Sequence, residues 1–125
     1  MSLDVSLKGP KYTTTCTCTD CGNSHTRVTA DVYFEQNITH NLGAMAKAAE
    51  LYTVLWHPES CGIRTASQLV EHLRPGLEIL LASPEKFRTL NPPNGWGTYE
   101  ALVGFVSNYI TGCEAYPDAF VETDK

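Results

Sequence analysis

The sequence has few basic residues, no long apolar run and no recognisable leader. Its nine lysines and arginines are scattered along the chain, and the formal net charge is −5 at pH 7. General binding to DNA or RNA needs a cationic face, so nucleic-acid binding is not expected. No run approaches the ~18 apolar residues of a membrane span, and the N-terminus lacks the basic-then-apolar form of a signal peptide. We therefore expect a cytoplasmic protein without membrane attachment.

Several familiar motifs are missing as well. There is no P-loop, no G-x-G-x-x-G and no G-x-S-x-G. Five cysteines are an odd number, and without an export signal a disulfide framework is not expected. The 125 residues are 42% hydrophobic and 18% charged, which is typical of one globular domain.

The N-terminal part, residues 1–36, is predicted to be rich in β-strands. Residues 3–8 alternate between polar and apolar side chains, and residues 11–17 are rich in Thr and Tyr. Residues 26–36 alternate again, so an antiparallel hairpin with the cysteines near its tip is the simplest arrangement. The face of this returning strand that should be half-buried consists of Val28, Ala30, Val32 and Phe34.

Residues 37–117 are predicted to be mainly helical. The first helix begins at Thr39 or Asn41 and continues to Leu55, because a proline shortly after that residue disfavours helical geometry. Its apolar residues recur at intervals of three and four. They are Leu42, Met45, Ala46, Ala49, Tyr52 and Trp56.

Three more helices follow. Thr65 and Gln68 have the spacing of a capping box, which predicts a helix to about residue 82 with a kink or break caused by Pro75. Ser83 followed by proline predicts a short helical turn. Thr98 caps the last helix, whose apolar stripe consists of Tyr99, Leu102, Val103, Val106, Tyr109, Ile110 and Cys113.

A short β-prone segment, residues 119–123, lies within the tail formed by residues 118–125. It is expected to add an edge strand beside residues 3–8 or beside the hairpin. The predicted fold is therefore a single α+β domain over residues 1–125. Three or four antiparallel strands are covered on one face by about three helices.

A cysteine cluster at residues 16–25 is a candidate zinc site. Cys18 and Cys21 form a C-x-x-C turn, in which two thiolates converge on one metal ion. Cys16 and His25 lie on either side of it, so four residues of the types that zinc accepts are close in sequence. A closed site with four protein ligands would be structural and not catalytic, because no position is left for water.

Thiol chemistry without a metal is the alternative. The three clustered cysteines can be free thiols in a loop, with a chance redox pair among them. Cys61 or Cys113, activated by His40 or His57, is a conceivable nucleophile. However, Cys113 fits an apolar helical stripe and Cys61 has no catalytic signature around it. His40, Cys61 and Cys113 are further candidate ligands for the zinc ion.

The polar run at residues 37–41 lies where a strand pattern ends and a helix pattern begins. Asn37, Thr39, His40 and Asn41 all carry groups that form hydrogen bonds. Such a junction directs free backbone N–H groups outward and suits an anionic or polar ligand. Helix capping alone is the alternative, because asparagine and threonine bond free N–H groups of a first turn.

The second polar and aromatic stretch is the loop at residues 91–97. Trp96 lies between two glycines and could stack on a base or a sugar, and Asn94 could bind polar edges. The alternative is that the tryptophan fills the core as the loop passes over it.

Three motifs of this chain resemble those of a family of small uncharacterised proteins in bacteriophage and prophage genomes. They are N-I-T-H-N at residues 37–41, L-W-H-P-E at 55–59 and N-P-P-N-G-W-G-T-Y at 91–99. The resemblance covers about residues 1–7 and 26–123, and it implies a viral setting but no reaction.

The chain departs from the pattern of that family in two places. His57 stands where arginine is expected, and Cys61 stands where an aliphatic residue is expected. The cysteine cluster resembles an insertion that only some members carry, which implies a stabilising role rather than a shared chemical one.

Three functions remain open. The first is a phage-encoded binding protein that holds a small nucleotide-like ligand or a host protein, in counter-defence. Its predicted site consists of Asn37, Thr39, His40, Asn41, His57, Asn94 and Trp96. The second is a small hydrolase or transferase with His40 as general base. The third is a purely structural domain stabilised by zinc. A homodimer is expected for a small α+β protein of this kind.

Overall fold

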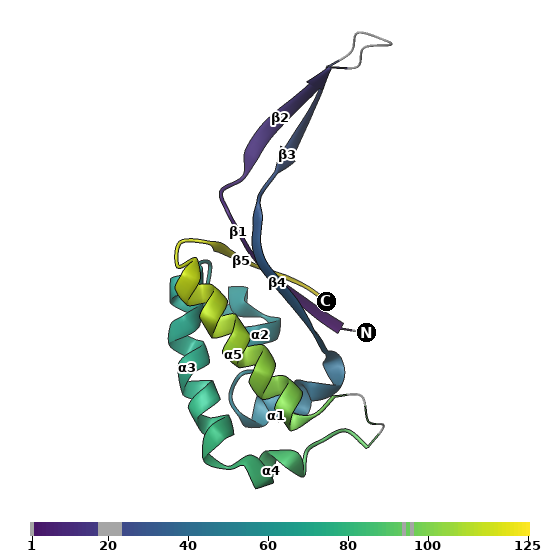
Figure 1. Ribbon diagram of the computed structural model, residues 1–125, viewed down its shortest axis with the longest axis vertical. Coiled ribbons are helices and arrows are strands. Elements are labelled where there is room, and N and C mark those ends of the chain that lie inside the picture. The colour runs from purple at the N-terminus through teal and green to yellow at the C-terminus, as the bar shows by residue number, and fades with distance from the viewer. Residues whose placement is uncertain (1, 18–23, 94, 96) are drawn as a thin grey trace.

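The chain forms an antiparallel sheet with helices on one side and a narrow hairpin that extends from it (Figure 1). The computed structural model describes residues 2–17, 24–93, 95 and 97–125. Its strands are β1 (Ser2–Lys8), β2 (Tyr12–Thr17), β3 (Ser24–Thr29), β4 (Val32–Thr39) and β5 (Phe120–Asp124). The predicted α+β class is confirmed.

Seven helical segments are assigned within those residues. Two are 3-10 helices, η1 (His40–Leu42) and η2 (Pro58–Cys61). The others are α1 (Gly43–Ala48), α2 (Tyr52–Trp56), α3 (Ala66–Ala82), α4 (Pro84–Arg88) and α5 (Tyr99–Ala115). Within the described ranges, no helix combines the length and the apolar composition that crossing a bilayer requires.

The three-stranded sheet has the order β4-β1-β5 among the described strands, with both neighbours antiparallel to β1. The alternation predicted for β1 is confirmed, since Leu3, Val5 and Leu7 are almost fully buried. The C-terminal strand pairs with β1 from Asp4 to Lys8, which is one of the two predicted placements. The core lies between this face of the sheet and the helices.

The segment predicted as one strand over residues 26–36 is divided into β3 and β4. Leu7 pairs with Phe34 but Lys8 pairs with Val32, so a bulge interrupts the register. A bulge shifts the alternation of side chains between the two faces. Val32 is consequently 48% exposed, and its predicted half-buried position is wrong.

The hairpin of β2 and β3, here called the arm, continues β1 and β4 beyond the sheet. Figure 1 shows it extending away from the helices. At its base, Gly9 donates a backbone hydrogen bond to the carbonyl of Asp31 over 2.9 Å. In the arm, Cys16 and His25 are directly paired. The predicted antiparallel hairpin is confirmed, while Cys18 and Cys21 lie outside the described residues.

The predicted first helix is broken in two. Glu50 has φ of +62°, and the backbone N–H of Leu51 donates to the carbonyl of Ala46 over 2.8 Å. This geometry ends α1 and turns Leu51 into the core, where its side chain is fully buried against Gly76 of α3. The continuous helix to Leu55 was therefore a wrong prediction, although most of its apolar stripe is buried.

Helix α3 continues through Pro75 without a break, so of the predicted kink or break the break is absent. The capping box at its start is present, with the Gln68 Oε1 accepting from the Thr65 backbone N–H over 3.2 Å. Pro75 is exposed and the next residue, Gly76, is buried in close contact with Leu51. Packing of this side against α2 and α5 compensates for the hydrogen bond that proline cannot donate.

Candidate ligand-binding site

The polar run at residues 37–41 joins β4 to η1 at one end of the sheet. Thr39 is extended, with φ −70° and ψ 142°, and its Oγ1 accepts from the Asn41 backbone N–H over 3.3 Å. Thr39 is therefore the N-cap of η1, which agrees with the capping expected of threonine at this position. Asn41 is exposed, and Leu42 after it is fully buried.

His40 is partly buried at this junction, edge-on to an aromatic ring. Its ring lies 6.0 Å from that of Trp56 at an angle of 76°. Trp56 is only 2% exposed, and the Tyr52 ring stacks on it with centroids 5.1 Å apart. The Nε2 atom of His40 is buried and has no hydrogen-bond partner among the residues that the structure describes. A polar ring nitrogen is thus held in an aromatic corner.

The loop before α5 reaches the same junction. Gly97 has φ of +114°, and a Cβ atom on it would lie 2.8 Å from the Thr39 Cγ2 and 2.9 Å from the Leu42 Cγ. The loop backbone therefore approaches the turn at a distance that only glycine permits. Two motifs more than fifty residues apart meet here. Asn94 and Trp96, the predicted ligand-binding residues of this loop, lie outside the described residues.

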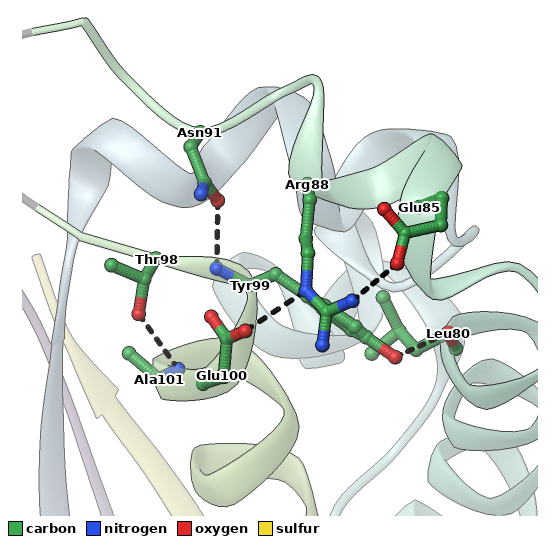
Figure 2. A network of polar contacts seen from close by, with 8 residues as sticks. All are labelled: Leu80, Glu85, Arg88, Asn91, Thr98, Tyr99, Glu100 and Ala101. Carbon is green, nitrogen blue, oxygen red and sulfur yellow. Dashed lines mark hydrogen bonds and ion pairs between the residues drawn. The ribbon is translucent and has the colours of Figure 1, made fainter.

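A network of polar contacts fixes both ends of this loop (Figure 2). The Asn91 Oδ1 accepts from the backbone N–H of Tyr99 over 2.8 Å, and the Thr98 Oγ1 accepts from Ala101 over 3.1 Å. The Tyr99 hydroxyl donates to the Leu80 carbonyl at the end of α3 over 2.7 Å. These bonds cap α5 and attach the loop to the core.

Arg88 closes the network on its solvent side. Its guanidinium group bonds Glu85 over 2.6 Å and Glu100 over 3.0 Å, and it lies over the Tyr99 ring at 5.3 Å. The hydrogen bond to Glu100 raises the pKa of Arg88. The pKa of the Glu100 carboxyl is lowered, first by a backbone hydrogen bond and then by Arg88. The exposed ion pairs orient the loop more than they stabilise the fold.

His57 contacts Tyr52, the ring that stacks on Trp56. Its ring meets Tyr52 edge-on at 5.9 Å. The Lys125 Nζ lies 3.0 Å from the His57 Nδ1, and the Glu59 Oε1 lies 3.7 Å from the same atom. The structure therefore connects the two histidines through Tyr52 and Trp56 and not by direct contact.

Asn37 is separated from the rest of the predicted site. Its amide donates to the Asp4 Oδ1 over 2.7 Å on the face of the sheet opposite to the helices. There it lines a hollow of about 510 Å³ that is bordered by all three strands. The described part of the site thus consists of Thr39, His40 and the loop backbone at Gly97.

No family model matches the sequence, and no curated protein or solved structure is significantly similar to it. The site must be interpreted from its own chemistry.

Metal-binding groups are not assembled in the described part of the chain. Among those residues, no cluster of three or more histidine, cysteine or carboxylate side chains is arranged to hold a metal ion. Cys61 is exposed and Cys113 is buried in α5, where burial raises the pKa of the Cys113 thiol to about 12. A thiol with a raised pKa is a poor nucleophile at neutral pH.

Two residues at this junction have no functional signal of their own in the sequence. The sequence predicts Gly97 only as a neighbour of the tryptophan in the loop, and Trp56 only as part of the apolar stripe of a helix. The only available signal was the glycine pair at positions 95 and 97, since two glycines so close together favour unusual backbone angles. The contact of Gly97 with Thr39 and Leu42 depends on the tertiary fold, and no local sequence pattern predicts it.

Proposed function

We propose that this chain is a binding protein for a small polar ligand at the corner formed by Thr39, His40 and the Gly97 loop. The observation that carries the proposal is the buried Nε2 atom of His40, which no described residue satisfies. Buried polar groups nearly always have a partner, and one without costs about 1–3 kcal/mol. A ligand that hydrogen bonds to this atom removes that cost.

The chemistry of the surroundings favours a nucleotide-like ligand. The Trp56 ring contacts His40 edge-on, and Tyr52 stacks on Trp56 in turn. Asn94 and Trp96 flank the glycines of the adjoining loop in sequence, and an indole with an amide suits a heterocyclic base. In this proposal the protein acts in the cytoplasm of a phage-infected cell and captures a host signal or host protein.

Binding is favoured over catalysis by the environment of His40. A histidine base is normally held in one tautomer by a carboxylate or another hydrogen-bond acceptor. Among the described residues no carboxylate bonds or pairs with His40, and its contact is with the ring of Trp56. The general-base hypothesis therefore lacks the orienting group that it needs.

We further propose that the cysteine cluster binds a structural zinc ion at the end of the arm. Support comes from the backbone pairing of Cys16 with His25, which brings these two positions together across the hairpin. A two-stranded hairpin is only marginally stable alone, and a metal adds stability where a core is missing. Cys18 and Cys21 would complete the site.

Thermal-shift screening against nucleosides, nucleotides and cyclic nucleotides tests the binding proposal. We expect at least one compound to raise the melting temperature of the unmodified protein, and isothermal titration calorimetry then gives its Kd. His40→Phe should lose this response. His72→Phe is the matched control, because His72 is exposed on α3. Equal binding by wild-type protein and His40→Phe would contradict the proposal.

A further inference from the structure

The face of the sheet opposite to the helices is a surface that no described element covers. Its residues come from all three strands and surround the hollow of about 510 Å³. Alternation places Ser6 of β1 between Glu35 of β4 and Glu122 of β5 in one row. The next row places Asp4 between Asn37 and Asp124. We call this surface the open sheet face.

The open sheet face is acidic at one end. Four carboxylates and one ammonium group line the hollow, namely Asp4, Glu35, Glu122, Asp124 and Lys8. Lys8 is already paired with Glu122 over 3.0 Å, and Asp4 accepts a hydrogen bond from Asn37. Glu35 and Asp124 form no ion pair with any described residue. An excess of negative charge therefore remains on a surface of fixed shape.

At the other end of the same face, two exposed apolar side chains lie on either side of Lys8. Val32 and Phe120 are both paired with Lys8, one on each side of it, and each is 48% exposed. The solvent-exposed face of an antiparallel sheet normally carries polar side chains. Two large apolar side chains on the outer strands of this face are therefore unusual. The combination of exposed apolar residues with charged residues around them is typical of interaction surfaces.

The dimensions of the face match a single helix. Three strands about 4.8 Å apart span about 10 Å, close to the diameter of ~10–12 Å of an α-helix with its side chains. The five positions at which β1 pairs with β5 extend about 14 Å, which is the length of a helix of about ten residues. One short helix would complete a second layer on the sheet.

We propose that the open sheet face binds a basic amphipathic helix of a partner protein. Apolar side chains of that helix contact Val32 and Phe120, and its lysines or arginines lie beside Glu35 and Asp124. Complementary charge favours this occupant over an acidic or neutral one, and it makes the association sensitive to salt. The open sheet face does not include the corner at His40. An experiment that contradicts helix binding at this face therefore leaves the proposed ligand site at His40 untouched.

Fluorescence anisotropy with a labelled helical peptide of alanine, leucine and lysine tests the proposal. The peptide carries leucines on one face and lysines beside them, and a second peptide has glutamate in place of each lysine. We expect the lysine peptide to bind and the glutamate peptide not to bind. Phe120→Ser and Glu35→Lys should each weaken binding about tenfold, as expected when an anchor or a charge pair is lost.

The matched controls lie on α3, away from the sheet. Leu81→Ser removes a side chain that is 56% exposed, and Glu78→Lys makes the same change of net charge as Glu35→Lys. Both should leave the affinity unchanged. Failure of the lysine peptide to bind, or equal weakening in face and control variants, would overturn the proposal.

Two measurements on the unmodified chain complete the test. On addition of the lysine peptide, NMR amide shifts should change most in β1 and β5, and changes confined to the helices would contradict the proposal. Analytical ultracentrifugation addresses a second copy as the occupant. A dimer of the wild-type chain that Phe120→Ser dissociates would assign the open sheet face to self-association instead.

Discussion

His40 is predicted to lower the stability of the free protein and to bind the ligand. Its buried Nε2 has no partner among the described residues, so a ring of similar shape without nitrogen should fit the corner better. We predict that His40→Phe leaves the free energy of unfolding unchanged or raises it by about 1 kcal/mol, while ligand binding is lost. Urea denaturation of the variant and of His72→Phe measures this. A loss of more than about 2 kcal/mol would mean that the imidazole is a structural group.

The buried thiol of Cys113 should make the free energy of unfolding depend on pH in the alkaline range. Burial raises the pKa of its thiol from 9.0 to about 12 in the folded protein. Above about pH 9 the unfolded state therefore binds fewer protons than the folded state, and stability falls as the pH rises towards 12. Denaturation midpoints at about pH 8 and about pH 10.5 should fall less in Cys113→Ala than in wild-type protein. Parallel declines would contradict this assignment.

At the scale of residues, the sequence predicted caps better than contacts. Thr39 and Thr98 cap η1 and α5 as expected, because the preference of threonine for N-caps is a local property. The isolation of Asn37 from His40 was not predicted. It follows from the alternation of β4, which carries Asn37 to the open sheet face while His40 follows the end of the strand.

The two long helices provide a pair of identical substitutions with opposite predicted signs. Gly104 of α5 has no atom near the position of a Cβ, so Gly104→Ala should raise the free energy of unfolding by about 0.5–1 kcal/mol. Gly76 of α3 lies against the buried Leu51, and a Cβ there would collide with its side chain. Gly76→Ala should therefore lower stability by about 1–2 kcal/mol. Chemical denaturation that gave both variants the same sign would contradict the packing of α3.

The loop before α5 provides a second matched pair. Gly97→Ala combines a positive φ with a collision against Thr39 and Leu42, so a loss of about 3 kcal/mol is expected. Gly95 also has a positive φ, but no described atom lies within 4 Å of the position of a Cβ there, so Gly95→Ala should cost only about 1 kcal/mol. Thermal unfolding distinguishes the two. Similar small losses in both would mean that the loop does not contact the turn at η1.

At the scale of elements, regular stretches were predicted well and their interruptions poorly. The apolar periodicity around Tyr109 identified α5, and Ser83 with proline identified the start of α4. The break at Glu50 was missed because its positive φ allows Leu51 to enter the core, which is a tertiary effect. Pro75 was expected to kink or break α3, but the helix is not broken there, because packing on its buried side compensates for the local penalty of proline.

The arm predicts a difference between local and global stability. Its strands β2 and β3 form a separate two-stranded sheet, whereas the three-stranded sheet and the helices share one core (Figure 1). If zinc holds the arm, chelation with EDTA should increase hydrogen exchange of amides in β2 and β3 while α3 and α5 remain protected. Unchanged exchange in the arm after chelation would contradict a structural zinc ion there.

At the scale of the whole molecule, the sequence predicted the class of fold but not its surfaces. The order of strands and helices indicated an antiparallel sheet with helical cover. The contact between the turn after β4 and the loop at Gly97 joins positions too far apart for any local pattern to reveal. The exposure of Val32 and Phe120 on one face likewise depends on a bulge and on the pairing of β5 with β1.

Native mass spectrometry of protein purified from infected or expressing cells tests the central claim most directly. We predict that the wild-type chain and His72→Phe carry a small molecule in addition to any zinc, and that His40→Phe lacks it. Identical masses for all three proteins after subtraction of the metal would contradict ligand binding at His40.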